Sequence, residues 1–209
     1  DDDNCLVGAI TADDLVDVLE EEATEDVQRL GGAEPLGRPY RSTSIAQTVR
    51  SRVGLLVLLL ATFAVSSVIM DLFRERLEAA IILTFFVPML MGTGGNTGSQ
   101  TIATLIRALA VGDVHPGEAP AVLWRELRAG LVLGALLAAA AYLVVSLWGS
   151  PRVALAVGVS TLAIVVWANT LGALLPLAAA RLRLDPALVS GPLLTTIIDA
   201  TGLLIYFGI

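Results

Sequence analysis

A single carboxylate, Asp199, lies deep within an apolar stretch at the end of the chain, "SGPLLTTIIDATGLLIYFGI". An ionised group at the centre of a bilayer costs at least about 2.5–3.5 kcal/mol, so it is expected to face water, a partner or an ion. Thr195 and Pro192 would share its face of a helix. Pro192 would also leave the carbonyl oxygen of Leu188 without its usual N–H donor, which adds a further oxygen. The alternative is a protonated or hydrogen-bonded contact between helices.

A second segment, residues 88–100 ("PMLMGTGGNTGSQ"), interrupts another apolar run with a proline, four glycines, an asparagine and a glutamine. Pro88 would free the carbonyl oxygen of Thr84, and each glycine disfavours a helix by about 1 kcal/mol relative to alanine. We therefore expect this segment to bend or unwind, which a bilayer tolerates only where the backbone faces a water-filled cavity. Asn96 and Gln100 would add two amides on one face. The alternative is a close helix crossing in which the glycines provide the contact.

These two segments offer oxygen atoms as ligands. The chain has no lysine, its single histidine, His115, falls in a predicted loop, and its single cysteine, Cys5, lies outside the apolar runs. Oxygen ligands favour hard cations such as Mg²⁺, Ca²⁺ or Mn²⁺. One carboxylate per chain is a poor site for a dication, so we expect a homodimer that brings two copies of Asp199 together. Because Mg²⁺ gives up water reluctantly, this site would hold the hydrated ion.

Five apolar stretches long enough to cross a bilayer must position these residues. They cover residues 53–72, 77–109, 126–149, 152–179 and 187–209. The expected fold is an all-α membrane protein with five transmembrane helices per chain, in which residues 53–209 form a pore domain with its pore at the homodimer interface. The content of 56% hydrophobic and 16% charged residues excludes a wholly soluble protein.

The arginines predict how the chain is oriented. Of the eleven from Arg41 to Arg183, eight fall on the side of the bilayer that carries the N-terminus and three on the other side. The positive-inside rule therefore predicts a multi-pass protein of the cell (inner) membrane with a cytoplasmic N-terminus and its C-terminus outside.

Residues 1–34 form an acidic piece that holds 12 of the 20 acidic residues and a single base. We expect a short strand over residues 6–11 and then a helix from Ala12, with Thr11 as its N-cap. One strand and one helix cannot bury a core alone, so they indicate the end of a larger soluble domain. Residues 35–52 would form a breaker-rich linker and a polar helix. Nothing in this charge pattern predicts a nucleic-acid partner, and no protein partner beyond a second copy is expected.

Residues 86–100 ("FVPMLMGTGGNTGSQ") and 185–207 ("DPALVSGPLLTTIIDATGLLIYF") together resemble the paired signatures of the MgtE family of magnesium channels and transporters. This resemblance covers the whole chain. It implies that residues 1–34 are the truncated C-terminal end of an α/β CBS domain and residues 35–52 a linker and plug helix. It further implies a dimeric channel for Mg²⁺ uptake across the plasma membrane, which recognises the hydrated ion and is gated by cytoplasmic Mg²⁺ through the CBS and plug region.

The resemblance also implies site residues. The expected metal ligands are Asp199, Asn96, Gly92, Gly95 and Thr195. The other expected pore-lining residues are Pro88, Thr97, Gly98, Gln100, Gly191, Pro192 and Thr196. Regulatory Mg²⁺ could bind the acidic cluster of residues 1–22, for which a solvated helix face is the alternative.

Two other activities stay open at this stage. A coupled secondary carrier of Mg²⁺, Mn²⁺ or Co²⁺ would also use interrupted helices. An intramembrane aspartyl protease would need two carboxylates that share a proton, and the chain offers these only if a dimer pairs two copies of Asp199. The sequence favours a transporter over an enzyme. It leaves selectivity among divalent cations open, because oxygen sites grade such ions rather than exclude them.

Overall fold

The computed structural model of the chain describes residues 10–36, 40–75, 81–147 and 150–209, and within these ranges all regular structure is helical. The long helices are α1 (Ala12–Leu30), α2 (Ile45–Leu72), α4 (Val87–Ala110), α5 (Ala119–Ser146), α6 (Pro151–Arg181) and α7 (Gly191–Gly208). Short 3₁₀ helices are η1 (Tyr40–Ser42), η2 (Ile81–Phe86), η3 (Pro116–Glu118) and η4 (Pro186–Leu188). The all-α prediction is confirmed for these ranges. The strand expected over residues 6–11 falls largely outside them.

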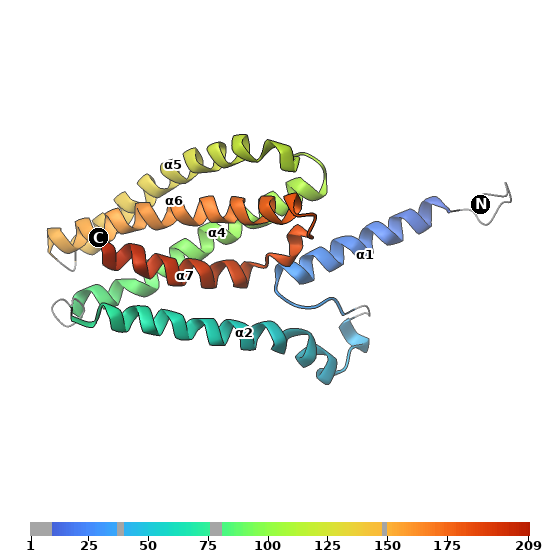
Figure 1. Cartoon of the computed structure of the whole chain (residues 1–209), viewed down its shortest axis with the longest axis horizontal. Helices are drawn as coiled ribbons and strands as arrows, with labels where there is room; N and C mark the ends of the chain where they lie inside the picture. Colours follow the sequence, from blue (N-terminus) through green and yellow to red (C-terminus); the bar gives the residue numbers. More distant parts are fainter. Residues whose placement is uncertain (1–9, 37–39, 76–80, 148–149) are drawn as a thin grey trace.

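Helix α1 begins where the sequence predicted. The Thr11 backbone N–H donates to Asp14 Oδ2 over 2.8 Å, and the Asp14 N–H donates back to Thr11 Oγ1 over 3.3 Å. The Thr11 hydroxyl also donates to the same carboxylate, and these bonds lower the pKa of Asp14. Helix α1 projects away from the other helices (Figure 1), and its C-terminal end contacts them through an ion pair between Arg29 and Asp185 and through the packing of Leu30.

Four helices are long and apolar enough to cross a membrane, judged by length and composition over the described residues. They are Ile45–Leu72, Pro116–Ser146, Pro151–Arg181 and Gly191–Gly208. We predicted five. Helix α4 is not among the four, although its 24 residues would span about 36 Å. The glycines of α4 and its hydroxyl and amide side chains lower its mean hydropathy. That α4 crosses the membrane therefore stays a prediction.

Three helices begin more than a turn away from the start of the apolar stretches predicted to cross the membrane. Helix α2 starts at Ile45 instead of residue 53, because Ser44 caps a polar lead-in that continues unbroken into the apolar run. Helix α4 starts at Val87 instead of residue 77, after η2 and with Pro88 in its first turn, where a missing N–H costs nothing. Helix α5 starts at Ala119 instead of residue 126, also with a proline in its first turn.

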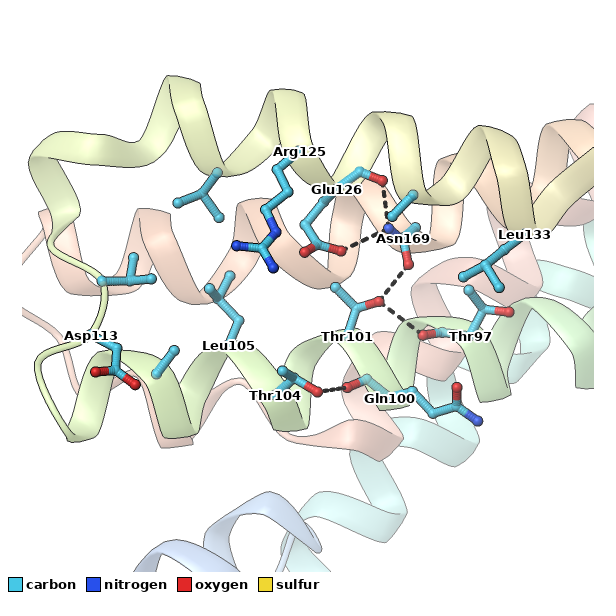
Figure 2. A pocket seen from close by; sticks show the side chains of 14 residues that line it. Thr97, Gln100, Thr101, Thr104, Leu105, Asp113, Arg125, Glu126, Leu133 and Asn169 are labelled. Carbon is cyan, nitrogen blue, oxygen red and sulfur yellow. Dashed lines mark hydrogen bonds between the residues drawn. The ribbon is translucent and has the colours of Figure 1, made fainter.

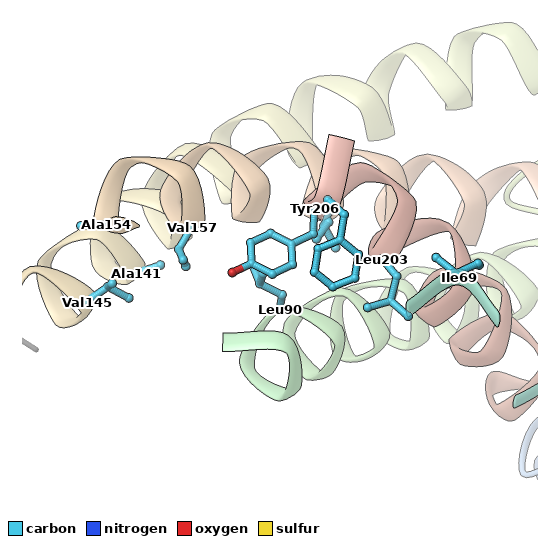
Figure 3. Packing of buried hydrophobic residues seen from close by; sticks show 10 residues of the cluster. Ile69, Leu90, Ala141, Val145, Ala154, Val157, Leu203 and Tyr206 are labelled. Atoms are coloured by element: carbon cyan, nitrogen blue, oxygen red, sulfur yellow. The ribbon is translucent and has the colours of Figure 1, made fainter. Parts of the chain in front are cut away.

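Helix α6 forms the centre of the bundle and packs against α4, α5 and α7. Its buried face is built from small and β-branched side chains such as Ala154, Val157, Ile164 and Ala168, all fully buried. Near the C-terminus, Leu90, Leu203 and Tyr206 join the α6 residues Ala154 and Val157 in one core cluster (Figure 3). This packing fixes α4 and α7, the two helices that carry the predicted site.

Candidate cation site

The glycine-rich segment 88–100 is helical, so our expectation that it bends or unwinds was wrong. Helix α4 runs without a break from Val87 to Ala110. A Cβ atom at Gly98 would lie 2.5 Å from Ile198 Cδ1 and 3.0 Å from Leu194 Cδ2, both on α7. Because glycine has no Cβ atom, α4 can approach its neighbours closely. The packing gained in this contact offsets the low helix propensity of the glycines. The close helix crossing, which was the alternative, is the arrangement found.

Our expectation that the carbonyl oxygen of Leu188 would be free of a hydrogen-bond donor was also wrong. Pro192 lies in the first turn of α7, as Pro88 does in α4, so neither proline interrupts a helix. The Leu188 carbonyl oxygen accepts the N–H of Ser190 over 3.0 Å. The hydroxyls of Thr195 and Thr196 both donate to the Pro192 carbonyl oxygen, over 2.9 and 3.0 Å. The oxygens of this face are therefore already hydrogen-bonded within α7 and the turn before it, apart from the Asp199 carboxylate.

Helices α4 and α7 run in opposite directions and bring the two predicted segments together. A Cβ atom at Gly95 would lie 3.2 Å from Thr195 Cγ2, and one at Gly202 would lie 3.1 Å from the Met91 side chain. Asp199 lies one turn beyond Thr195, so it comes level with the turn of α4 that contains Gly92. The structure thus places Gly92, Gly95, Thr195 and Asp199 at one crossing.

The Asp199 carboxylate is only half-buried. Over the ranges the structure describes, it makes no hydrogen bond and no ion pair. Its charge is therefore not compensated within one chain, and the hydrogen-bonded helix contact considered as an alternative is not found there.

One face of α4 remains open beside this carboxylate. The residues Pro88, Gly92, Asn96 and Gln100, spaced four apart, are all exposed. A Cβ atom at Gly92 would meet no other atom within 4 Å. These residues form a row that winds slowly around α4, and no part of the described chain covers it. We call it the open α4 stripe.

The other expected pore-lining residues lie elsewhere in the single chain. Gly98 is buried against α7, and Thr196 is buried with 5% of its surface exposed. Gly191, at the start of α7, is half-buried near Ser99. Thr97 is buried and lines a separate pocket.

That pocket has a volume of about 410 Å³ and lies between α4, α5 and α6 (Figure 2). At its wall the buried Asn169 joins three helices. Its Oδ1 accepts the Thr101 hydroxyl of α4 over 2.6 Å, and its Nδ2 donates to the carbonyl oxygen and Oε2 of Glu126 on α5, over 2.6 and 2.9 Å. The sequence analysis missed both Asn169 and Glu126. The sequence did offer a sign of Asn169, because a polar amide within a predicted membrane stretch is unusual and needs a hydrogen-bond partner.

We expect Thr101→Val to lower the free energy of unfolding by about 1 kcal/mol, because it leaves Asn169 Oδ1 buried without a donor. Thermal unfolding in detergent measures this. Thr104→Val is the matched control, since the Thr104 hydroxyl donates only to the Gln100 carbonyl of its own helix. Equal melting temperatures for the two variants would contradict a bracing role for the Thr101–Asn169 bond.

The site has few charged ligands. Among the residues with a described position, no three His, Cys, Asp or Glu side chains come close enough to hold a metal ion. A dication at Asp199 would therefore need the neutral oxygens of α4, its own water, or a second chain.

Comparison with known proteins identifies the family. The MgtE family, described as a divalent cation transporter, matches residues 87–209. The magnesium transporter MgtE of Thermus thermophilus is 44% identical over 212 residues, which is 100% of this chain and 46% of the relative. Those of Bacillus subtilis and Enterococcus faecalis are 33% and 32% identical, with the same two coverages. The chain spans about half the length of these relatives. Since the family match covers more than half of the chain and includes both α4 and α7, the chain belongs to the MgtE family of divalent cation transporters.

Proposed function

We propose that this chain forms the pore of a Mg²⁺ channel that mediates Mg²⁺ uptake across the plasma membrane. The observation that carries the proposal is the half-buried, unpaired Asp199 carboxylate beside the open α4 stripe. A half-buried charge needs a counter-ion, and the amide oxygens of Asn96 and Gln100 can accept hydrogen bonds from the water of a hydrated cation. The relatives named as magnesium transporters support Mg²⁺ as the ion, while Mn²⁺, Co²⁺ and Ca²⁺ are further candidates.

The pore is proposed to form between two copies of the chain. Membrane helices associate through small residues and interhelical hydrogen bonds, and the open α4 stripe offers both. A two-fold axis beside this stripe would place two Asp199 carboxylates around one dication. With α4 counted as a fifth crossing, the termini lie on opposite sides of the membrane, and the arginines favour a cytoplasmic N-terminus. In Figure 1 the start of α1 and the end of α7 lie at opposite ends of the molecule.

Gating by cytoplasmic Mg²⁺ is proposed to act through α1. This helix would be the last helix of a CBS domain, and the first turns of α2 would be the plug. Arg29 at the end of α1 pairs with Asp185, which caps η4 immediately before α7. A movement of the cytoplasmic part would therefore reach the helix that carries Asp199 through this contact.

The experiment that tests the proposal is Mg²⁺ flux into liposomes that contain the full chain. A channel passes Mg²⁺ along its electrochemical gradient alone, and a membrane potential that is negative inside accelerates entry. A coupled carrier, the second candidate, would need a gradient of another ion. No flux under either condition would overturn both proposals. The family comprises transporters and not enzymes, so the protease alternative is not pursued.

The dimer makes a separate prediction. In a Cys5→Ser background, which removes the only native cysteine, we expect Asn96→Cys to give a dimer cross-linked by a bifunctional maleimide in membranes, because the open α4 stripes of two chains would face each other across the pore. The control is Ala135→Cys, which is exposed on α5 and outside the proposed interface. Equal cross-linking at both positions, or none at Asn96→Cys, would contradict this interface.

A further inference from the structure

We propose that one face of α5 binds an anionic phospholipid, whose phosphate is held by Arg125 and Arg128. This site is distinct from the cation site and requires only that α5 crosses a membrane. One open surface is formed by residues of this helix alone: Ala121, Trp124, Arg125, Arg128, Ala129, Val132 and Leu133. Residues 121, 125, 128 and 132 follow the helical repeat, so they lie on one face.

The side chains along this face change from polar to apolar in the direction of the chain. Trp124, Arg125 and Arg128 lie in the first turns of α5, and Val132 and Leu136 follow on the same side. The apolar pair is well exposed, at 64% and 65%, and would contact acyl chains in a bilayer. The exposed Trp124 marks the level of the headgroups, because tryptophan favours the interface between lipid and water. Arg125 and Arg128 would then lie at the level of the lipid phosphates.

The two guanidinium groups lack a protein counter-ion. Of the described carboxylates, none lies within ion-pair distance of Arg125 or Arg128. By contrast, Arg29 contacts two carboxylates. Adjacent arginines at the edge of an apolar surface are costly unless an anion lies between them. A phosphodiester meets this need, since guanidinium groups bind phosphate oxygens in pairs and at short distance.

Neighbouring charges restrict where the phosphate can lie. Arg125 also borders the pocket of Figure 2, whose lining includes Glu126 and Asp113. These carboxylates would repel a phosphate inside that pocket, so the headgroup is placed on the Arg128 side of Arg125. A free phosphate ion would leave the apolar half of the face unused. The charge and the apolar surface together favour a lipid.

The test uses Trp124 as the reporter, with the full chain in phosphatidylcholine micelles. Brominated phosphatidylglycerol, which quenches tryptophan on contact, is titrated in, and the signal of Trp124 is the part that Trp124→Phe removes. We expect quenching at a much lower lipid fraction than with brominated phosphatidylcholine. The double variant Arg125→Gln/Arg128→Gln should weaken this binding about 30-fold, since each basic residue at an anionic membrane surface contributes a factor of about five. Arg74→Gln/Arg152→Gln removes the same charge elsewhere and should change little.

Three outcomes would overturn the proposal. One is an unchanged preference for phosphatidylglycerol in the Arg125→Gln/Arg128→Gln variant. Another is full competition by millimolar inorganic phosphate at constant ionic strength, which would indicate a site for the free ion. The third is protection of Trp124 that grows with protein concentration, which would show that a second copy covers α5. None of these readouts needs Mg²⁺ flux, so they stand apart from the test of the proposed function.

Discussion

Replacing Asp199 by asparagine is expected to lower the initial rate of Mg²⁺ uptake at least about 100-fold. The substitution keeps the shape of the side chain and removes its charge. At an effective dielectric constant of about 20, a carboxylate about 5 Å from a dication contributes roughly 7 kcal/mol of attraction before desolvation is subtracted. A net loss of only about 2.7 kcal/mol already corresponds to 100-fold. Asp199 is the only acidic residue of α4 and α7, so no other side chain of these two helices can replace this attraction.

Uptake is measured in liposomes and as growth of a strain without its own Mg²⁺ importers on low Mg²⁺. Asp71→Asn serves as the control, because it removes one acid from an exposed position at the end of α2. Wild-type growth or flux with Asp199→Asn would remove the basis of the proposed function. If Asp71→Asn reduced flux equally, overall charge rather than this site would be responsible.

Replacing Gly172 by alanine is expected to lower the free energy of unfolding by about 1–3 kcal/mol, the usual cost of an extra methyl group in a filled core. The new Cβ atom would lie 2.8 Å from the backbone carbonyl oxygen of Gly98 and 3.0 Å from Thr101 Cβ. A carbonyl oxygen of α4 cannot rotate away as a side chain would, so α4 and α6 must separate. This cost exceeds the gain of about 1 kcal/mol that alanine normally brings to a helix.

Thermal unfolding in detergent should show a melting temperature lower by roughly 2–12 °C for a chain of this length. Gly54→Ala is the matched control, because Gly54 also lies inside a helix and a Cβ atom there would meet nothing within 4 Å. That variant should be neutral or stabilised. Equal stability of Gly172→Ala and wild type would show that α4 and α6 can separate freely, contrary to the packing described here.

The sequence by itself determined the helical membrane class, the start of α1 and the family signatures. These features depend on local chemistry: apolar runs, an N-cap at Thr11, and a carboxylate that stands out within an apolar stretch. Asp199 could be singled out because burying a charge is costly wherever the surrounding helices lie.

The state of the glycine-rich segment could be decided only by tertiary structure. Glycine permits both an unwound segment and a helix that crosses its neighbour closely. The low helix propensity of glycine favours the unwound segment. The side chains of Ile198 and Leu194 occupy the space beside Gly98. Packing against these residues, which are distant in the sequence, therefore stabilises the helical form of the segment. The bond between Thr101 and Asn169 depends on the same packing, because the α4–α6 contact brings together residues that are 68 positions apart in the sequence.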